Sequence, residues 1–212
     1  MDLFEEKNIN LESDIDGKGM QKDESQNPFL TKAKDAVCKI TYKDSFGTGF
    51  FCSIPDTVLG VPFTVLITNC HVYPQDSNLA EEKFIDININ GNSKRIYFEG
   101  RGKWSDSKMD FTCIEIKEED NIKTTFFLDD NILKSNYSHE DYKNKSVTVY
   151  GINKNDNYKL NYSYGYIKNI KNSNFMHTCN TYRGFSEDVL SFEKLIVSLG
   201  FMMQALMERN LI

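Results

Sequence analysis

The stretch FTVLITNCHV, residues 63–72, combines a strand signal with a reactive side chain. Its first five positions are mostly β-branched or aromatic, which predicts a buried β-strand over 63–69. His71 follows directly after this strand. The other two histidines are less well placed for chemistry, because His139 lies in a polar stretch and His177 lies inside another strand signal. The stretch therefore predicts a β-fold with a candidate functional histidine at a strand end.

Similar signals occur on both sides of this stretch. Short runs rich in Val, Ile, Thr, Tyr and Phe alternate with clusters of Asp, Asn, Gly and Ser, a pattern typical of strands and turns. The expected strands of the first part are 36–43, 47–53, 63–69, 83–90, 94–99 and 110–117. Strands of this number and length can close one small antiparallel barrel. Further strands are expected at 146–152, 158–169 and 175–180, where a second barrel would begin.

The composition is that of an ordinary globular protein, with 212 residues of which 40% are hydrophobic. No run approaches the ~18 apolar residues that a membrane span requires. The chain opens with MDLFEE rather than with a basic and then apolar signal segment. These features lead us to expect a cytoplasmic protein without membrane association.

Negative charge is concentrated at the beginning of the chain. Residues 1–26 hold eight acidic residues and three lysines, a local net charge of −5, whereas the whole chain has −6. Such a segment buries too little apolar surface to offset its chain entropy, so we expect a disordered acidic tail over 1–30. The rest of the chain is nearly neutral. It offers no basic face for phosphates, and we expect no nucleic-acid partner.

The cysteine pattern favours buried free thiols. There are five cysteines, an odd number, without a CxxC pair, so neither a disulfide framework nor a zinc ribbon is expected. A metal site built from Cys70, His71, His177 and Cys179 is an alternative with loose ligand spacing. We expect no metal ion and no other cofactor.

Two further segments place reactive side chains at strand ends. Asp110 leads into the apolar strand predicted at 110–117. Ser186 ends the segment NTYRGFS, residues 180–186, which follows the strand predicted at 175–180. Along the chain the order is therefore His71, Asp110 and Ser186.

These segments, together with the hairpin sequence GTGFF at 47–51, resemble the trypsin-like (chymotrypsin-fold) serine peptidases over residues 36–186. The bacterial and protist, glutamyl-endopeptidase-like branch is the most similar in style. The resemblance implies an all-β, chymotrypsin-like double antiparallel β-barrel. The first barrel would span 31–117, a connection 118–144 and an incomplete second barrel 145–189. A helical segment is expected over 190–212, because Leu, Ile and Met recur there at helical spacing.

The resemblance also implies a reaction and a set of roles. In a serine endopeptidase of this kind Ser186 is the nucleophile, His71 is the general base, and Asp110 orients the imidazole. The backbone amides of Gly184 and Ser186 would form the oxyanion hole. The substrate would be a protein or peptide.

Specificity would depend on the residues that precede the serine. Asn180, six residues before Ser186, would lie at the base of the specificity pocket, with Thr181 beside it. An uncharged residue at this place argues against a preference for Lys or Arg.

The residues after Ser186 depart from the family pattern. Glu187 and Asp188 stand where the family has glycine, and 190–212 lacks the expected strands. One alternative is therefore a catalytically inactive, truncated pseudopeptidase or a peptide-binding remnant. Another is the loss of one base beside the Ser186 codon, since the displaced reading frame can encode Ser-Gly-Gly at this point.

Overall fold

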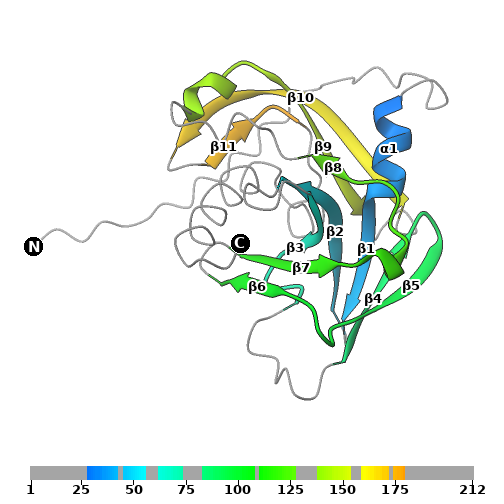
Figure 1. The fold of residues 1–212 in the computed structure, drawn as a ribbon. Coiled ribbons are helices and arrows are strands. Elements are labelled where there is room, and N and C mark those ends of the chain that lie inside the picture. The colour runs from blue at the N-terminus through cyan, green and yellow to red at the C-terminus, as the bar shows by residue number, and fades with distance from the viewer. Residues whose placement is uncertain are drawn as a thin grey trace, which may run out of the picture.

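The chain is all-β, as expected, and its strands form two sheets (Figure 1). The computed structural model describes residues 28–42, 45–55, 62–73, 83–107, 110–127, 138–153, 159–171 and 174–179. The expected helical segment 190–212 and most of the expected acidic tail 1–30 lie outside these residues. Within the described part, no helix is long and apolar enough to cross a membrane.

The larger sheet has eight strands and curls into a half-barrel. Its strands are β1 (Val37–Tyr42), β2 (Ser45–Ile54), β3 (Phe63–Thr68), β4 (Phe84–Ile89), β5 (Asn92–Tyr97), β6 (Lys103–Asp106), β7 (Phe111–Ile116) and β8 (Phe126–Phe127). Neighbouring strands follow the order β5-β4-β1-β2-β3-β7-β6 with antiparallel pairing throughout. The short strand β8 pairs in parallel with β2. The sequence patterns missed β6 and β8, which have four and two residues.

The smaller sheet lies across the first and has three described strands. They are β9 (Ser146–Asn153), β10 (Lys159–Lys171) and β11 (Asn174–His177), in the antiparallel order β11-β10-β9. The long strand β10 bends over the top of the view in Figure 1 and changes register between Ile167 and Asn169. This arrangement agrees with a chymotrypsin-like fold whose second barrel is incomplete in the described part of the chain.

Short helices supplement the sheets. Helix α1 (Pro28–Ala36) precedes β1, where the sequence suggested tail up to residue 30 and strand from residue 36. Two 3-10 turns, η2 (Glu118–Asp120) and η4 (His139–Tyr142), follow β7 and precede β9. The helix packs with Ala33 and Ala36, which are fully buried against the large sheet. Small side chains allow this close approach of helix and sheet.

The core lies on both faces of the large sheet because its central strands are apolar at successive positions. On β2, Phe50 and Cys52 belong to one apolar cluster, whereas Phe51 belongs to the other. The second cluster fills the inside of the curl. The first cluster includes Ile152 of β9, so the two sheets share it. The five cysteines are buried free thiols, as the sequence predicted.

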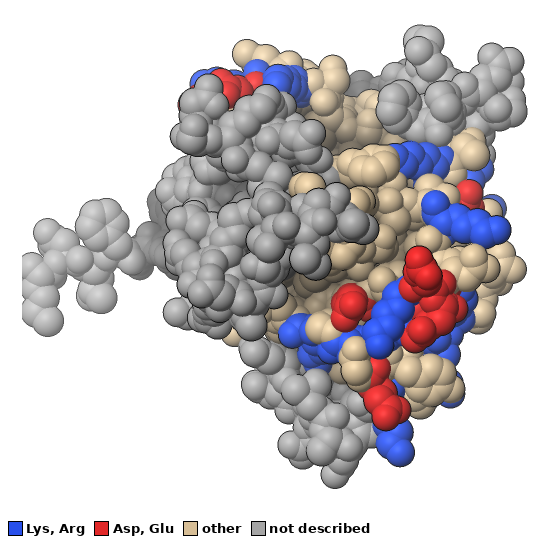
Figure 2. Space-filling view, viewed as in Figure 1, with Lys and Arg blue, Asp and Glu red and all other residues tan. Residues whose placement is uncertain are grey.

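Charged side chains of both signs lie interleaved on the described surface in the lower right of Figure 2. Arg95 of β5 pairs with Asp86 of β4 at 2.7 Å, and the buried guanidinium of Arg101 pairs with Asp120. Each of these two arginines therefore has an acidic partner.

Candidate functional site

The pairing of β3 with β7 brings His71 and Asp110 together across 39 positions of sequence. The two strands are antiparallel, with Thr68 at the end of β3 opposite Thr112 near the start of β7. A residue just after β3 and a residue just before β7 must therefore lie at the same edge of the sheet. His71 and Asp110 occupy these two places.

Both side-chain oxygens of Asp110 bind His71. Oδ1 accepts a hydrogen bond from the backbone N–H of His71 at 2.9 Å, and Oδ2 lies 2.7 Å from Nδ1 of the imidazole. An ionised carboxylate can only accept, so Nδ1 carries the proton in this contact. The imidazole is thereby held in the tautomer that leaves Nε2 as a proton acceptor.

The surroundings of Asp110 keep it ionised. Burial raises the pKa of this carboxyl, but the backbone and side chain of His71 and the amide of Asn69 lower it by donating hydrogen bonds. The net pKa lies below the ordinary value. The backbone of Asp110 has φ 52°, in the left-handed region that Asp tolerates better than most residues.

The turn that carries His71 is anchored on both sides. The N–H groups of Val72 and Tyr73 both donate to the carbonyl of Asn69 at 3.2 Å. Cys70, Val72 and Tyr73 are buried, whereas 54% of the His71 side chain is exposed. The imidazole is thus exposed to solvent, while the residues on either side of it are buried.

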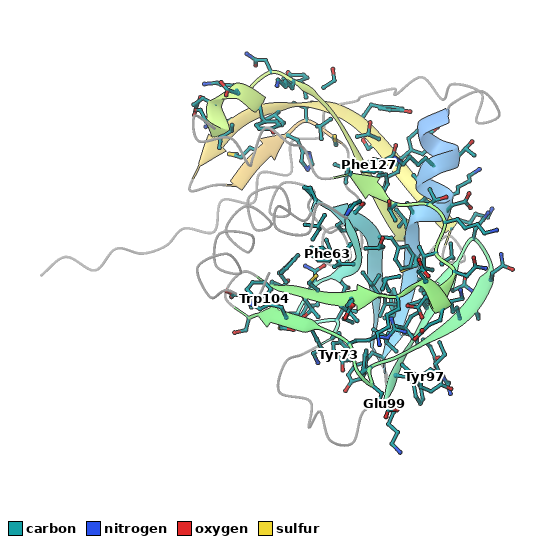
Figure 3. The ribbon with its side chains drawn as sticks, in the orientation of Figure 1. Phe63, Tyr73, Tyr97, Glu99, Trp104 and Phe127 are labelled. Atoms are coloured by element: carbon teal, nitrogen blue, oxygen red, sulfur yellow. The ribbon has the colours of Figure 1, made fainter. Side chains whose placement is uncertain are left out.

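The ring of Tyr73 anchors the turn in the core of the half-barrel. It packs against Tyr42 at 4.7 Å and Phe98 at 5.3 Å between ring centroids. In Figure 3 Tyr73 lies in the lower part of the sheet, between Trp104 of β6 and Tyr97 of β5. The residue two positions after His71 is therefore fixed by the core.

The GTG motif supports the same turn. A Cβ atom on Gly47 would lie 2.4 Å from Cγ2 of Val72, so glycine is needed where β2 passes the turn. The carbonyl of Thr48 accepts a hydrogen bond from Oγ1 of Thr68 at 3.0 Å. Two of the segments on which the family resemblance rests, 47–51 and 68–72, are thus in direct contact.

Two polar residues of this region were not predicted from the sequence to take part in it. Asn69 donates to Asp110, and Thr112 donates from Oγ1 to the carbonyl of Tyr73 at 3.2 Å while contacting Ser105 at 2.8 Å. Thr112 is fully buried. The signal for Thr112 was a polar residue inside an apolar strand, and the signal for Asn69 was a polar residue two positions before His71.

The remaining predicted site residues lie outside the described part of the chain. These are Ser186, Gly184, Asn180 and Thr181. The described residues end at Cys179, directly before Asn180. A Cβ atom on Gly165 of β10 would lie 2.6 Å from the backbone nitrogen of Cys179. The backbone at Cys179 therefore packs closely against β10.

The residues of the alternative metal site make other contacts. The imidazole of His71 faces Asp110, and Nδ1 of His177 accepts the backbone N–H of Cys179 at 3.1 Å. Burial lowers the pKa of His177. Among the described residues, no three His, Cys, Asp or Glu side chains are grouped to hold a metal ion.

Comparison with known proteins gave likenesses of structure only. No protein-family model and no curated protein match the sequence. The Rv3671c protease in its inactive form is 15% identical with a TM-score of 0.49, over 75% of this chain and 73% of that one. An inactive serine-to-alanine mutant of Rv3671c from M. tuberculosis H37Rv is 15% identical with a TM-score of 0.42, over 69% of this chain. The serine endoprotease from Yersinia pestis is 15% identical with a TM-score of 0.41, over 68% of this chain. The matches span 56% of the mutant chain and 45% of the Yersinia chain.

Proposed function

We propose that this chain is a trypsin-like serine endopeptidase of the glutamyl-endopeptidase-like branch, with His71, Asp110 and Ser186 as its catalytic triad. The observation that supports this proposal is the contact between Oδ2 of Asp110 and Nδ1 of His71 at 2.7 Å. It joins an ionised carboxylate to an exposed imidazole at the edge of a rigid sheet. A general base needs this combination of fixed tautomer and access to substrate.

The reaction would proceed through an acyl-enzyme. Nε2 of His71 takes the proton of Ser186 Oγ as this oxygen attacks the scissile carbonyl carbon, and a tetrahedral oxyanion forms. The imidazolium then gives its proton to the leaving amine as the peptide C–N bond breaks. In the second half, His71 takes a proton from water as the water oxygen attacks the acyl carbon. It then gives this proton to Ser186 Oγ as the ester C–O bond breaks. Asp110 stabilises the imidazolium in both halves without taking its proton.

The residues around the serine would bind the substrate. The amides of Gly184 and Ser186 form the oxyanion hole, where each donor supplies ~3 kcal/mol toward the tetrahedral intermediate. Asn180 and Thr181 lie in the specificity pocket. The first barrel, 31–117, supplies the histidine and the aspartate, and the second, 145–189, supplies the serine. The substrate class is a protein or peptide.

A fluorophosphonate probe tests the proposal, because only an activated serine reacts with it quickly. We expect time-dependent labelling of the purified chain, detected as a mass increase on the peptide that contains Ser186. Ser186→Ala should abolish the labelling, and His71→Ala should slow it strongly. His177→Ala is the matched control, since this histidine belongs to β11 and its Nδ1 accepts a hydrogen bond from the backbone N–H of Cys179.

Two results would contradict the proposal. One is a folded chain, with the circular dichroism of a β-protein, that the probe does not label. The other is labelling that persists in Ser186→Ala. If the probe labels the chain, the unlabelled chain is incubated with a mixed peptide library. Mass spectrometry of the cleavage sites then identifies the residue preferred before the scissile bond.

A further inference from the structure

The side chain of Asn69 crosses from the end of β3 to the start of β7. Its Nδ2 donates to Oδ2 of Asp110 at 3.0 Å and lies 3.3 Å from the backbone carbonyl of the same residue. A carboxamide nitrogen has two protons, one for each of these acceptors. Asn69 therefore binds the side chain and the backbone of Asp110 at once.

This double contact occurs where the backbone needs support. Asp110 adopts φ 52°, a left-handed conformation that is unfavourable for residues with a Cβ atom. The Asn69 amide holds its carbonyl in this conformation. Asn69 is itself fixed, since its own carbonyl accepts two hydrogen bonds from the turn at Val72 and Tyr73.

The contact also decides which way the carboxylate faces. Oδ2 accepts from both Asn69 and Nδ1 of His71, and Oδ1 accepts from the backbone N–H of His71. Rotation of the carboxylate about its Cβ–Cγ bond would break three hydrogen bonds together. Without Asn69, the donors to the carboxylate in these contacts would both belong to His71, and no third group would hold the carboxylate in place.

We propose that Asn69 is a positioning residue that fixes the Asp110 carboxylate so that Oδ2 faces Nδ1 of His71. This inference rests on the proposed function for its effect on activity. Its geometric part concerns the tautomer of His71 alone and is measurable in a chain without activity.

The test uses Asn69→Ala and Asn69→Asp in the full chain. Asn69→Asp keeps the size of the side chain but replaces a donor by a carboxylate against Asp110, so it should be the more severe change. Nitrogen-15 spectra of the labelled imidazoles, assigned with His71→Ala, report whether the neutral ring of His71 carries its proton on Nδ1 or Nε2. We expect Nδ1–H in the unaltered chain and a shift toward Nε2–H in both variants.

Activity provides the second readout. Loss of one hydrogen bond to a charged group corresponds to about 10- to 100-fold, so we expect fluorophosphonate labelling of Asn69→Ala to slow by this factor. Asn88→Ala is the matched control. Its amide donates to Ser93 and its Oδ1 accepts from the backbone N–H of Gly91, both at the β4–β5 turn, so the labelling rate and spectra should be unchanged.

Each outcome bears on the inference. It is overturned if His71 of the unaltered chain carries its proton on Nε2, or if Asn69→Ala and Asn69→Asp keep both the native tautomer and the native labelling rate. If the unaltered chain is not labelled but loses the Nδ1–H tautomer in Asn69→Ala, the positioning role stands and the proposed function fails. If either variant does not fold, the other variant and the tautomer of the unaltered chain still decide.

Discussion

The side-chain oxygen of Thr48 accepts a hydrogen bond from the backbone N–H of Ile152 at 3.2 Å, across 104 positions of sequence. Thr48 is 2% exposed and lies on β2, and Ile152 lies on β9. Since the carbonyl of Thr48 also accepts a hydrogen bond from Thr68, one residue of the GTG motif connects the second sheet to the end of β3, three residues before His71. The GTG motif therefore links the two sheets through hydrogen bonds of Thr48.

Thr48→Val should destabilise the chain by about 1–3 kcal/mol, because it keeps the shape of the side chain but leaves the Ile152 N–H without this acceptor. Urea unfolding measures the change. Thr41→Val is the matched control, since Thr41 is exposed on the neighbouring strand β1 and should change stability by less than about 0.5 kcal/mol. Equal stabilities of the two variants would show that the hydrogen bond between the sheets contributes nothing.

Gly47→Ala should destabilise the turn that carries His71, because the new Cβ would lie 2.4 Å from Cγ2 of Val72. Overpacking of this kind costs about 1–3 kcal/mol. Val72→Ala removes the opposing methyl groups, so the double variant should be more stable than the sum of the single changes by roughly 0.5–3 kcal/mol. Unfolding curves of the four chains measure this coupling, and strict additivity would refute the close contact.

The local patterns singled out His71 and Asp110 as candidate residues but not the contacts that hold them together. The end of β3 could be predicted because it follows the continuous apolar run of Val65, Leu66 and Ile67. The start of β7 could be predicted because Asp110 directly precedes another apolar run. The contact of Asn69 with Asp110 was not readable, because it depends on the left-handed backbone of Asp110. The Thr48–Ile152 contact depends on how the two sheets pack, which no local pattern encodes.

The missed elements have a similar explanation. Helix α1 has nine residues, and among positions 31–36, whose burial is described, the fully buried ones are the short Ala33 and Ala36. Its apolar periodicity is therefore weak. Strand β8 is the dipeptide Phe126–Phe127, too short for any alternation. Its Phe127 is 74% exposed and lies under the ammonium of Lys32 of α1, 4.5 Å from the ring centroid, on the helix side of the molecule in Figure 3. Tertiary pairing with β2, rather than sequence pattern, makes this dipeptide a strand.

The contribution of Asp110 to stability should depend on pH in a defined direction. Its pKa in the folded chain is lowered below its ordinary value, which is about 3.9 for an unfolded chain. Its stabilising effect is therefore fully present above about pH 4 and is lost as the pH falls through the folded pKa. The difference in unfolding free energy between the unaltered chain and Asp110→Asn should shrink between pH 7 and pH 3. A difference that stays constant over this range would contradict the lowered pKa.

Asp110→Asn should reduce activity far more than stability. The asparagine can present its NH2 group to His71 and so favour the wrong tautomer, for which a loss of roughly 10³- to 10⁴-fold is expected. The fluorophosphonate labelling rate measures it. Asp86→Asn is the matched control, because Asp86 is an exposed aspartate of the same sheet that pairs with Arg95. A small loss in Asp110→Asn, similar to that of the control, would remove Asp110 from the triad.

Replacing Glu187 and Asp188 together by glycine should accelerate labelling of Ser186 by at least about tenfold. Glycine permits the crowded backbone conformations that follow a nucleophile, and removal of two carboxylates lowers the energy of the developing oxyanion. The control is Glu118→Gly with Glu119→Gly, which removes the same charge from the two exposed residues of η2. Similar rates in both double variants would show that the two acidic residues do not restrain Ser186.

The transcript tests the origin of the same two residues. If one base was lost beside the Ser186 codon, the sequenced transcript should contain the codons that read Gly-Gly-Cys in the displaced frame over 187–189. The two adjacent methionine codons at 202–203 force an aspartate in that frame, but most other positions depend on free third bases. Codons incompatible with Gly-Gly after Ser186 would end this explanation and make Glu187 and Asp188 native features of the serine segment. The rate of the glycine variant would then measure how far those two residues slow the reaction of Ser186 in the proposed triad.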